Sequence, residues 1–211
     1  MIISPGFQCG ESPLAQNCGP YNRDTIFVPF QLNSANAINH VYDTIKLISS
    51  FNDTIHSVQG KTFLHPFNTL NLNVQAYKIV NTGSGATLNY ANIEFNPLIT
   101  EGQYQNISTS GINILYNRIV PNNKLQFSLV AGMPGLYLIT LNMRDYSQGL
   151  FIYEPNNYCN EYKVNSFIPE SQQRKQYWDT IGTTTLRLNG NNNFIVANKE
   201  ETNYFFIKVN F

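Results

Sequence analysis

Charged residues are scarce in this chain. Asp, Glu, Lys and Arg together make up 12% of the 211 residues, which is about half their usual share. The 13 basic and 13 acidic side chains cancel, whereas binding to the phosphates of a nucleic acid needs clustered Lys and Arg. The composition therefore predicts no nucleic-acid partner.

Long apolar runs are also missing. No stretch reaches the roughly 18 apolar residues of a membrane-spanning helix, so we expect no transmembrane segment. The N-terminal sequence Met-Ile-Ile-Ser-Pro lacks the basic region and the apolar core of a signal peptide. Either the protein stays inside the cell or a signal or anchor is absent from this sequence, and the composition favours the second. We therefore expect an extracellular or outer-membrane-surface location.

Cysteine and histidine are rare. The cysteines are Cys9, Cys18 and Cys159, and the first two lie in a segment rich in Gly, Pro and Asn that has no core of its own. We favour a Cys9–Cys18 disulfide, which would tie this segment down. Three unpaired thiols, or a bond from Cys159 to either of the others, are the alternatives. The three histidines stand at no recognised metal spacing, so we expect no metal and no cofactor.

Amide and aromatic residues are abundant instead: the chain holds 30 Asn, 13 Tyr and 14 Phe. So many aromatic residues exclude a disordered chain. Apolar and polar residues alternate, most clearly over residues 70–79, where Leu70, Leu72, Val74 and Ala76 share one face. Similar stretches, separated by turn-forming residues, lie at 25–31, 44–49, 111–119, 124–130, 136–141, 149–153, 161–167, 183–188, 193–197 and 204–211. The spacing of these stretches is typical of a sandwich or a barrel. We favour the sandwich, so the sequence predicts an all-β fold, an antiparallel β-sandwich that is immunoglobulin-like in general character.

One segment departs from this alternation. Residues 169–177 begin with Pro and an acid and end with bases, which favours a short helix near residues 170–178, and a long polar loop is the alternative. We expect an extended N-terminal arm over residues 1–22, followed by one sandwich domain over residues 23–211. The alternative is two β subdomains divided near residue 102.

The motifs of common active sites are absent from the sequence. It has no Gly-x-Ser-x-Gly elbow, no His-Glu-x-x-His and no P-loop. Glycoside hydrolysis needs two carboxylates across a cleft, and nothing in the sequence pairs candidates such as Glu94 and Glu101. We therefore expect a protein that is not an enzyme.

Aromatic side chains are candidates for ligand binding. Tyr177 and Trp178, which holds the only indole in the chain, have flat faces on which a sugar ring or a protein side chain can stack. A Trp that packs over the end of the sandwich is the alternative. Tyr104, in a polar segment, is a weaker candidate.

The tripeptide Asp-Thr-Ile occurs four times and contains four of the five Asp residues. An Asp that ends a turn before a β-branched strand start explains part of this pattern. The tripeptide also resembles the O-glycosylation acceptor of exported Bacteroidota proteins, in which Asp precedes Ser or Thr and an apolar residue. This resemblance implies that the candidate acceptors are Thr25, Thr44, Thr54 and Thr180, of which only exposed ones can be modified.

Two longer stretches carry a second resemblance. Residues 42–51, Tyr-Asp-Thr-Ile-Lys-Leu-Ile-Ser-Ser-Phe, resemble an early strand of a group of exported, mostly uncharacterised Bacteroidota lipoproteins. Residues 135–141, Gly-Leu-Tyr-Leu-Ile-Thr-Leu, are similar to a strand of immunoglobulin-like sandwiches. The resemblance covers most of residues 40–211 and implies a compartment more than a chemistry. Cys9 follows Pro-Gly-Phe-Gln, so it is a poor match to a lipidation site.

Together these features predict an exported, non-enzymatic module that binds a protein or glycan at the cell surface through loops at one end of a rigid sandwich. One alternative is a structural subunit of a surface filament or coat that self-assembles by strand donation, with residues 1–22 and the apolar segment 25–30 as the donor. A further alternative is a carbohydrate-binding module.

Overall fold

The computed structural model describes residues 22–33, 38–51, 54–56, 58–60, 62–64, 69–81, 86–101, 103–108, 111–117, 123–143, 150–154, 158–168, 172–191, 194–201 and 203–211. These residues form mainly β-strands, with one short 3-10 helix and one α-helix among them. In chain order the elements are β1 (Asn22–Pro29), β2 (Gln31–Asn33), β3 (Ile38–His40), β4 (Thr44–Phe51), β5 (Thr54–His56), β6 (Thr62–Leu64), β7 (Thr69–Ile79), β8 (Thr87–Tyr90), η3 (Asn92–Glu94), β9 (Phe95–Glu101), β10 (Gln103–Ser108), β11 (Gly111–Asn117), β12 (Asn123–Ala131), β13 (Gly135–Met143), β14 (Leu150–Glu154), β15 (Tyr158–Phe167), α1 (Gln172–Ile181), β16 (Thr185–Leu188), β17 (Ile195–Asn198) and β18 (Tyr204–Asn210).

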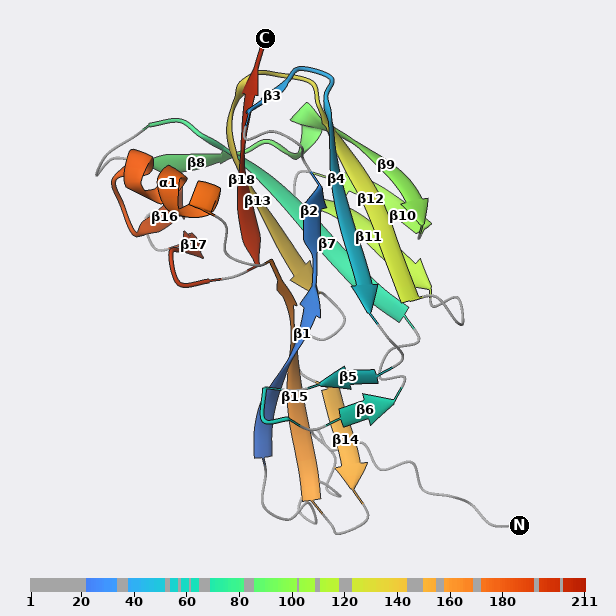
Figure 1. Cartoon of the computed structure of the whole chain (residues 1–211). Coiled ribbons are helices and arrows are strands. Elements are labelled where there is room, and N and C mark those ends of the chain that lie inside the picture. Colours follow the sequence, from blue (N-terminus) through green and yellow to red (C-terminus); the bar gives the residue numbers. More distant parts are fainter. Residues whose placement is uncertain are drawn as a thin grey trace.

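Two sheets form the body of the molecule. The large sheet has nine strands, in the order β17-β16-β8-β7-β13-β18-β3; β11 also pairs with β7, and β10 pairs with β11. The small sheet has the order β2-β4-β12-β9. They face each other in the upper part of Figure 1, and the lower part holds the sheet β1-β15-β14 and the hairpin β5–β6. Each of these two sheets contains described strands from before and after residue 102. In the large sheet β7 pairs with β11, and in the small sheet β9 pairs with β12.

The main core fills the space between the two sheets. Alternate residues of each strand point inward, for example Leu72, Val74 and Ala76 of β7, all of which are buried. The facing positions of the small sheet are Ile45, Leu47, Leu125, Phe127 and Leu129. This inward set is the apolar face that the alternation predicted, so the all-β sandwich predicted from the sequence is confirmed.

The other face of β7 is buried as well, which the alternation did not indicate. Asn73 is 3% exposed, and its side-chain amide donates a 2.8 Å hydrogen bond to Oδ1 of Asn113 on the neighbouring strand. A Cβ at Gly111 would clash with Nδ2 of Asn73, so the glycine leaves room for this amide. Further along the same face, Tyr77 belongs to a second core.

The second core lies between the large sheet and α1. Trp178 and Ile181 of the helix pack on Tyr204 and Phe206 of β18, together with Leu186 of β16. The short helix expected near residues 170–178 is therefore present, shifted to Gln172–Ile181. Its two apolar residues share a face because they stand three positions apart.

The sequence predicted antiparallel sheets, but the described sheets also contain parallel pairs. Three described pairs are parallel: β1 with β15, β16 with β8, and β18 with β3. Each parallel pair joins strands far apart in the chain, which local alternation cannot indicate because it shows a strand's face and not its partner. The segment 25–30 that we considered as a donor strand lies largely in β1, which pairs with β15 of the same chain.

Every strand predicted from the alternation overlaps an observed strand. The strands that the sequence did not indicate are short or irregular: β2, β3, β5, β6, β8, β9 and β10. Several have only three or four residues, and β9 contains a proline, so their alternation is too brief or too interrupted to detect. Residues 1–21 of the expected arm lie outside the described part of the chain.

Candidate binding surface

Four segments meet at the upper end of the sandwich (Figure 1): the turn after β3, the turn after β12, η3 and the end of β18. Main-chain hydrogen bonds join each segment to the next. They run from the Val41 N–H to the Asn210 oxygen over 2.9 Å, from the Tyr42 N–H to the Ala131 oxygen over 2.9 Å, and from the Gly132 N–H to the Glu94 oxygen over 2.7 Å. The result is a continuous strip of fixed backbone across the end of both sheets.

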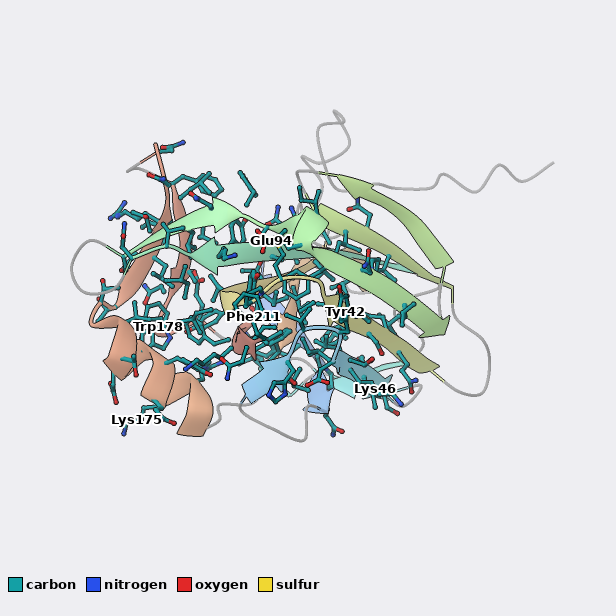
Figure 2. All side chains as sticks on the ribbon, turned by 90° about the horizontal axis from the view of Figure 1, so that it is seen from above. Tyr42, Lys46, Glu94, Lys175, Trp178 and Phe211 are labelled. Atoms are coloured by element: carbon teal, nitrogen blue, oxygen red, sulfur yellow. The ribbon has the colours of Figure 1, made fainter. Side chains whose placement is uncertain are left out.

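Large apolar side chains on this strip are exposed to solvent. Tyr42 is 76% exposed, Ile93 79% and Met133 54%, and we call these three residues the end patch. Because a side chain of this size has a surface of about 200 Å², the patch exposes about 400 Å². Figure 2 looks down on this end and shows Tyr42, Glu94 and the exposed Phe211 above the ends of the sheets. A patch of this size is as large as the functional patches of typical monomers.

Tyr42 has an unusual backbone conformation. It is the one described residue other than glycine with a positive φ, 74°. The left-handed region is unfavourable for most side chains by about 1–2 kcal/mol, and Gly or Asn adopts it more readily. The turn is held by main-chain contacts, the Asp43 N–H donating to the His40 oxygen over 3.0 Å and the His40 N–H to Asp43 Oδ2 over 2.7 Å. Neither contact needs the tyrosine ring, so the fold does not explain why an aromatic residue stands here.

Beside this turn, η3 is attached firmly to the large sheet. Asn92 is 1% exposed, and its Oδ1 accepts a 2.6 Å hydrogen bond from the Ala76 N–H of β7. The Ala91 N–H donates in turn to the Ala76 oxygen over 2.8 Å. Both polar groups of Ala76 are therefore satisfied by the segment that carries Ile93, and this segment is fixed in place.

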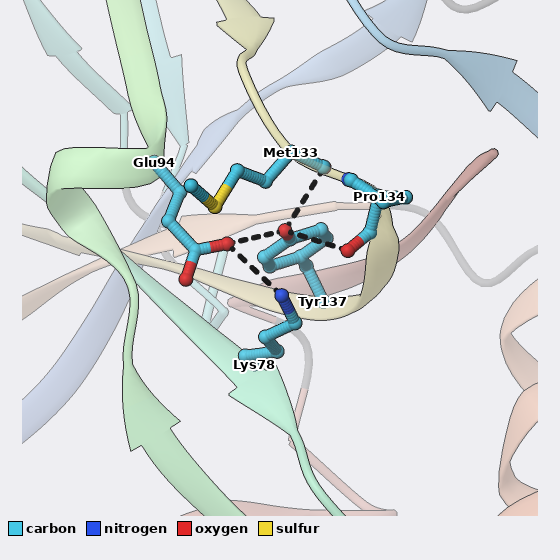
Figure 3. Close-up of polar contacts among 5 residues, drawn as sticks. All are labelled: Lys78, Glu94, Met133, Pro134 and Tyr137. Atoms are coloured by element: carbon cyan, nitrogen blue, oxygen red, sulfur yellow. Dashed lines mark hydrogen bonds and ion pairs between the residues drawn. The ribbon is translucent and has the colours of Figure 1, made fainter. Parts of the chain in front are cut away.

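Beneath the end patch, Glu94 connects two strands of the large sheet (Figure 3). Its Oε2 accepts a 2.5 Å hydrogen bond from the Tyr137 hydroxyl and lies 3.3 Å from the ammonium of Lys78. The Tyr137 hydroxyl also lies 3.0 Å from the Met133 carbonyl oxygen. Since the hydroxyl has one proton, the charged carboxylate, the stronger acceptor, takes it. The three side chains hold η3 to β7 and β13 under the exposed residues.

The same contacts determine the chemistry of Tyr137. Its side chain is fully buried, and this desolvation raises the pKa of its hydroxyl well above the ordinary value. The hydrogen bond to Glu94 and the charge of Glu94 raise the pKa further. Its ring packs edge-on against Phe95, with 4.9 Å between the centroids, and Lys78 lies 5.5 Å from the ring centre. Tyr137 therefore stays a neutral donor near pH 7, which suits a structural role and not proton transfer.

The structure places Trp178 in the second core rather than on the surface. It is 2% exposed, and its indole N–H donates a 2.6 Å hydrogen bond to the Tyr204 hydroxyl. Its ring packs edge-on against Tyr204 and Phe206, with centroid distances of 5.9 and 5.4 Å. Tyr177 is half-buried against Phe206 at 5.5 Å. A stacking platform needs an open ring face, so Trp178 has the packing role that we stated as its alternative.

The candidate acceptor threonines differ in exposure. Thr44 at the start of β4 and Thr180 in α1 are exposed, and Thr25 in β1 is half-buried. The Thr180 hydroxyl donates to the Gln176 oxygen over 2.8 Å. The predicted Cys9–Cys18 pair lies outside the described residues, as do the side chains of Thr54, Tyr104 and Cys159.

The sequence did not reveal the end patch, because its residues lie far apart in the chain. Tyr42 directly precedes an Asp-Thr-Ile strand start, and Met133 precedes Pro134 and Gly135. Both positions are turns, where polar residues are the usual choice. A large apolar residue in each of two turns was the signal available, and it could not show that the turns meet.

Two further kinds of site are absent from the part of the chain that the structure describes. None of its helices has both the length and the apolar character needed to cross a bilayer. Its His, Cys, Asp and Glu side chains form no group of three that could hold a metal ion.

Comparisons with known proteins give little further information. No protein-family model matches the chain, and a search of curated proteins found no match. Among solved structures, the chain is similar to the second type II cohesin module from the cellulosomal adaptor ScaA scaffoldin of Acetivibrio cellulolyticus. The TM-score is 0.35 and the identity 11%, over 70% of this chain and 94% of that module. The sandwich architecture described above therefore rests on the strand pairing and the core, not on this similarity.

Proposed function

We propose that this protein is an exported, non-enzymatic module that binds a partner protein through the end patch. The observation that carries this proposal is Tyr42, a large aromatic side chain that is 76% exposed on a backbone with φ of 74°. Strained residues that the fold does not require are concentrated at functional sites. An exposed aromatic anchor is also typical of the residues that dominate binding energy in interfaces.

The chemistry of the patch favours a protein partner over a glycan. Tyr42, Ile93 and Met133 offer apolar surface, and Met is adaptable to different partner shapes. Sugar recognition combines one stacking ring with several hydrogen-bonding groups placed around it. The rigid backbone below the patch reduces the entropy lost when a partner binds.

Site-specific photo-cross-linking tests this proposal. A photo-reactive amino acid replaces Ile93 in protein exposed to the native host's surface extract. The control carries the same group at Phe194, which is 47% exposed and directly precedes the edge strand β17. We expect one partner protein to be linked at position 93 and not at position 194. The partner is then purified, and its affinity is measured for the unmodified protein and for three variants.

The expected result is that Tyr42→Asn and Ile93→Ser each weaken binding by about tenfold or more, as for interface anchors, while Phe194→Ser leaves it unchanged. The proposal would be contradicted if all three variants bound the partner as tightly as the unmodified protein does, or if no protein were cross-linked at position 93. Melting curves of the variants separate a loss of binding from a loss of folding.

A further inference from the structure

The outer face of the small sheet continues directly from the end patch. Its outward-pointing residues form rows across β4, β12 and β9. The row nearest the end is Thr44, Val130 and Asn96, and the next is Lys46, Ser128 and Leu98. We call these six residues the docking face. Tyr42 lies two residues before β4, and η3 immediately precedes β9, so the face and the end patch form one surface.

The docking face is nearly free of charge. Thr44, Asn96 and Leu98 are exposed and Val130 is half-buried, Leu98 being 55% exposed. Ser128 is 8% exposed because it lies between Lys46 and Leu98, and cross-strand neighbours stand about 5 Å apart. Depletion of charge around apolar contacts is the composition that distinguishes the centre of an interface from ordinary surface.

Lys46 is the exception in this uncharged surface. It is half-buried in β4, an inner strand of the small sheet, and lies between Ser128 of β12 and the edge strand β2. Figure 2 shows it near the edge of the molecule. No acidic side chain in the described residues forms an ion pair with its ammonium. By contrast, Lys78 and Lys199 each have an acidic partner.

We infer that the partner covers the docking face together with the end patch and places an Asp or Glu carboxylate on the Lys46 ammonium. This inference rests on the proposed function and names the chemistry of the partner: a folded protein surface with apolar contacts around one acidic residue. The end patch alone exposes about half of the roughly 800 Å² that each partner buries in a stable complex. The docking face supplies the additional area.

Charge complementarity explains why the carboxylate belongs there. When a partner excludes water from this face, an unpaired ammonium loses hydration and gains nothing in return. A carboxylate opposite it restores the balance and rejects partners that present a base or an apolar group at that position. Lys46 thus determines which partner binds, while the end patch supplies apolar contact.

The test uses the partner protein recovered by cross-linking at position 93. A photo-reactive group at Leu98 should also link to it. A carbodiimide should then join Lys46 to one partner carboxylate, forming an amide between Nζ and the acid with loss of water, and peptide mass spectrometry identifies that residue. We expect Lys46→Met to weaken binding by about tenfold or more and Lys46→Glu to weaken it further. Exchanging the identified partner acid for Lys should restore binding to Lys46→Glu.

The matched control is Lys175→Met, which removes an exposed lysine from α1 and should leave the affinity unchanged. Linkage at position 93 without linkage at position 98 would overturn the inference and leave the proposed function intact. Unchanged affinity of Lys46→Met, together with a wild-type melting curve, would do the same, because Lys46 would then serve only to keep the sheet face hydrated. Failure at position 93 itself would overturn both.

Discussion

Replacement of Tyr42 should separate binding from stability. Two variants, Tyr42→Asn and Tyr42→Ala, both remove the ring. Asn tolerates the left-handed conformation at φ 74°, and Ala does not. We therefore expect Tyr42→Asn to be more stable than Tyr42→Ala by about 1 kcal/mol.

The wild-type ring contributes little that would offset this difference. It is 76% exposed, so it buries roughly 50 Å² of its own surface at most. The apolar part of this buried area stabilises the fold by about 0.5 kcal/mol. Tyr42→Asn should accordingly unfold at or slightly above the wild-type midpoint. The Ala variant should melt about 2–4 °C below the Asn variant. Both should lose partner affinity equally, since the ring is what binds.

Thermal and urea unfolding of the three proteins, followed by circular dichroism, measure these differences. Ala and Asn variants of equal stability would show that the backbone at residue 42 stores no strain. A Tyr42→Asn variant less stable than the wild type by more than about 1 kcal/mol would show that the ring packs on the fold. Either result would refute the argument that Tyr42 is present for binding.

Four further outcomes are expected. Tyr137→Phe removes the donor to the Glu94 carboxylate and should lower the free energy of unfolding by about 1.5–3 kcal/mol in urea titrations; an unchanged value would show that Lys78 alone fixes Glu94. Burial raises the pKa of Tyr77 and Tyr137 in the folded state. The contribution of their protonated hydroxyls to the free energy of unfolding is therefore complete below the unfolded pKa of about 10 and is lost as the pH rises above it. The fall in urea midpoint between pH 9 and 11 should therefore be smaller in Tyr77→Phe, and an identical slope would contradict this assignment. Trp178→Ala should destabilise by about 3–5 kcal/mol, read from the melting curve, and a wild-type melt would restore a surface role for the indole. If O-glycosylation occurs in the native host, peptide mapping should find it at the exposed Thr44 or Thr180 and not at half-buried Thr25, and a glycan on Thr44 should be absent from the partner-bound fraction.

The strands were predictable where alternation was long, as in β7, where Leu72, Val74 and Ala76 face one core. The helix was predictable from its polar sequence and from the proline at position 169, shortly before it. The parallel pairs were not, because alternation carries no information on a strand's partner. Trp178 could not be assigned to a core or a surface from sequence, since an aromatic residue suits both until the covering element is known.

The end patch was beyond prediction for a different reason. Tyr42, Ile93 and Met133 are brought together by main-chain hydrogen bonds between segments that no local pattern relates. The expectation that loops at one end of the sandwich bind a partner named no residue. The positive φ of Tyr42 became visible only in three dimensions.

The strip of backbone at the sandwich end has an evolutionary consequence. Its segments are held to one another by N–H and C=O groups, which every residue except proline possesses. Substitutions at positions 42, 93 and 133 can therefore change the exposed surface without removing the contacts that support it. Chains that share this scaffold could diverge rapidly in what they recognise while their cores stay alike. Sequence variation concentrated at these three positions, against a constant pattern of buried residues, would be the record of such divergence.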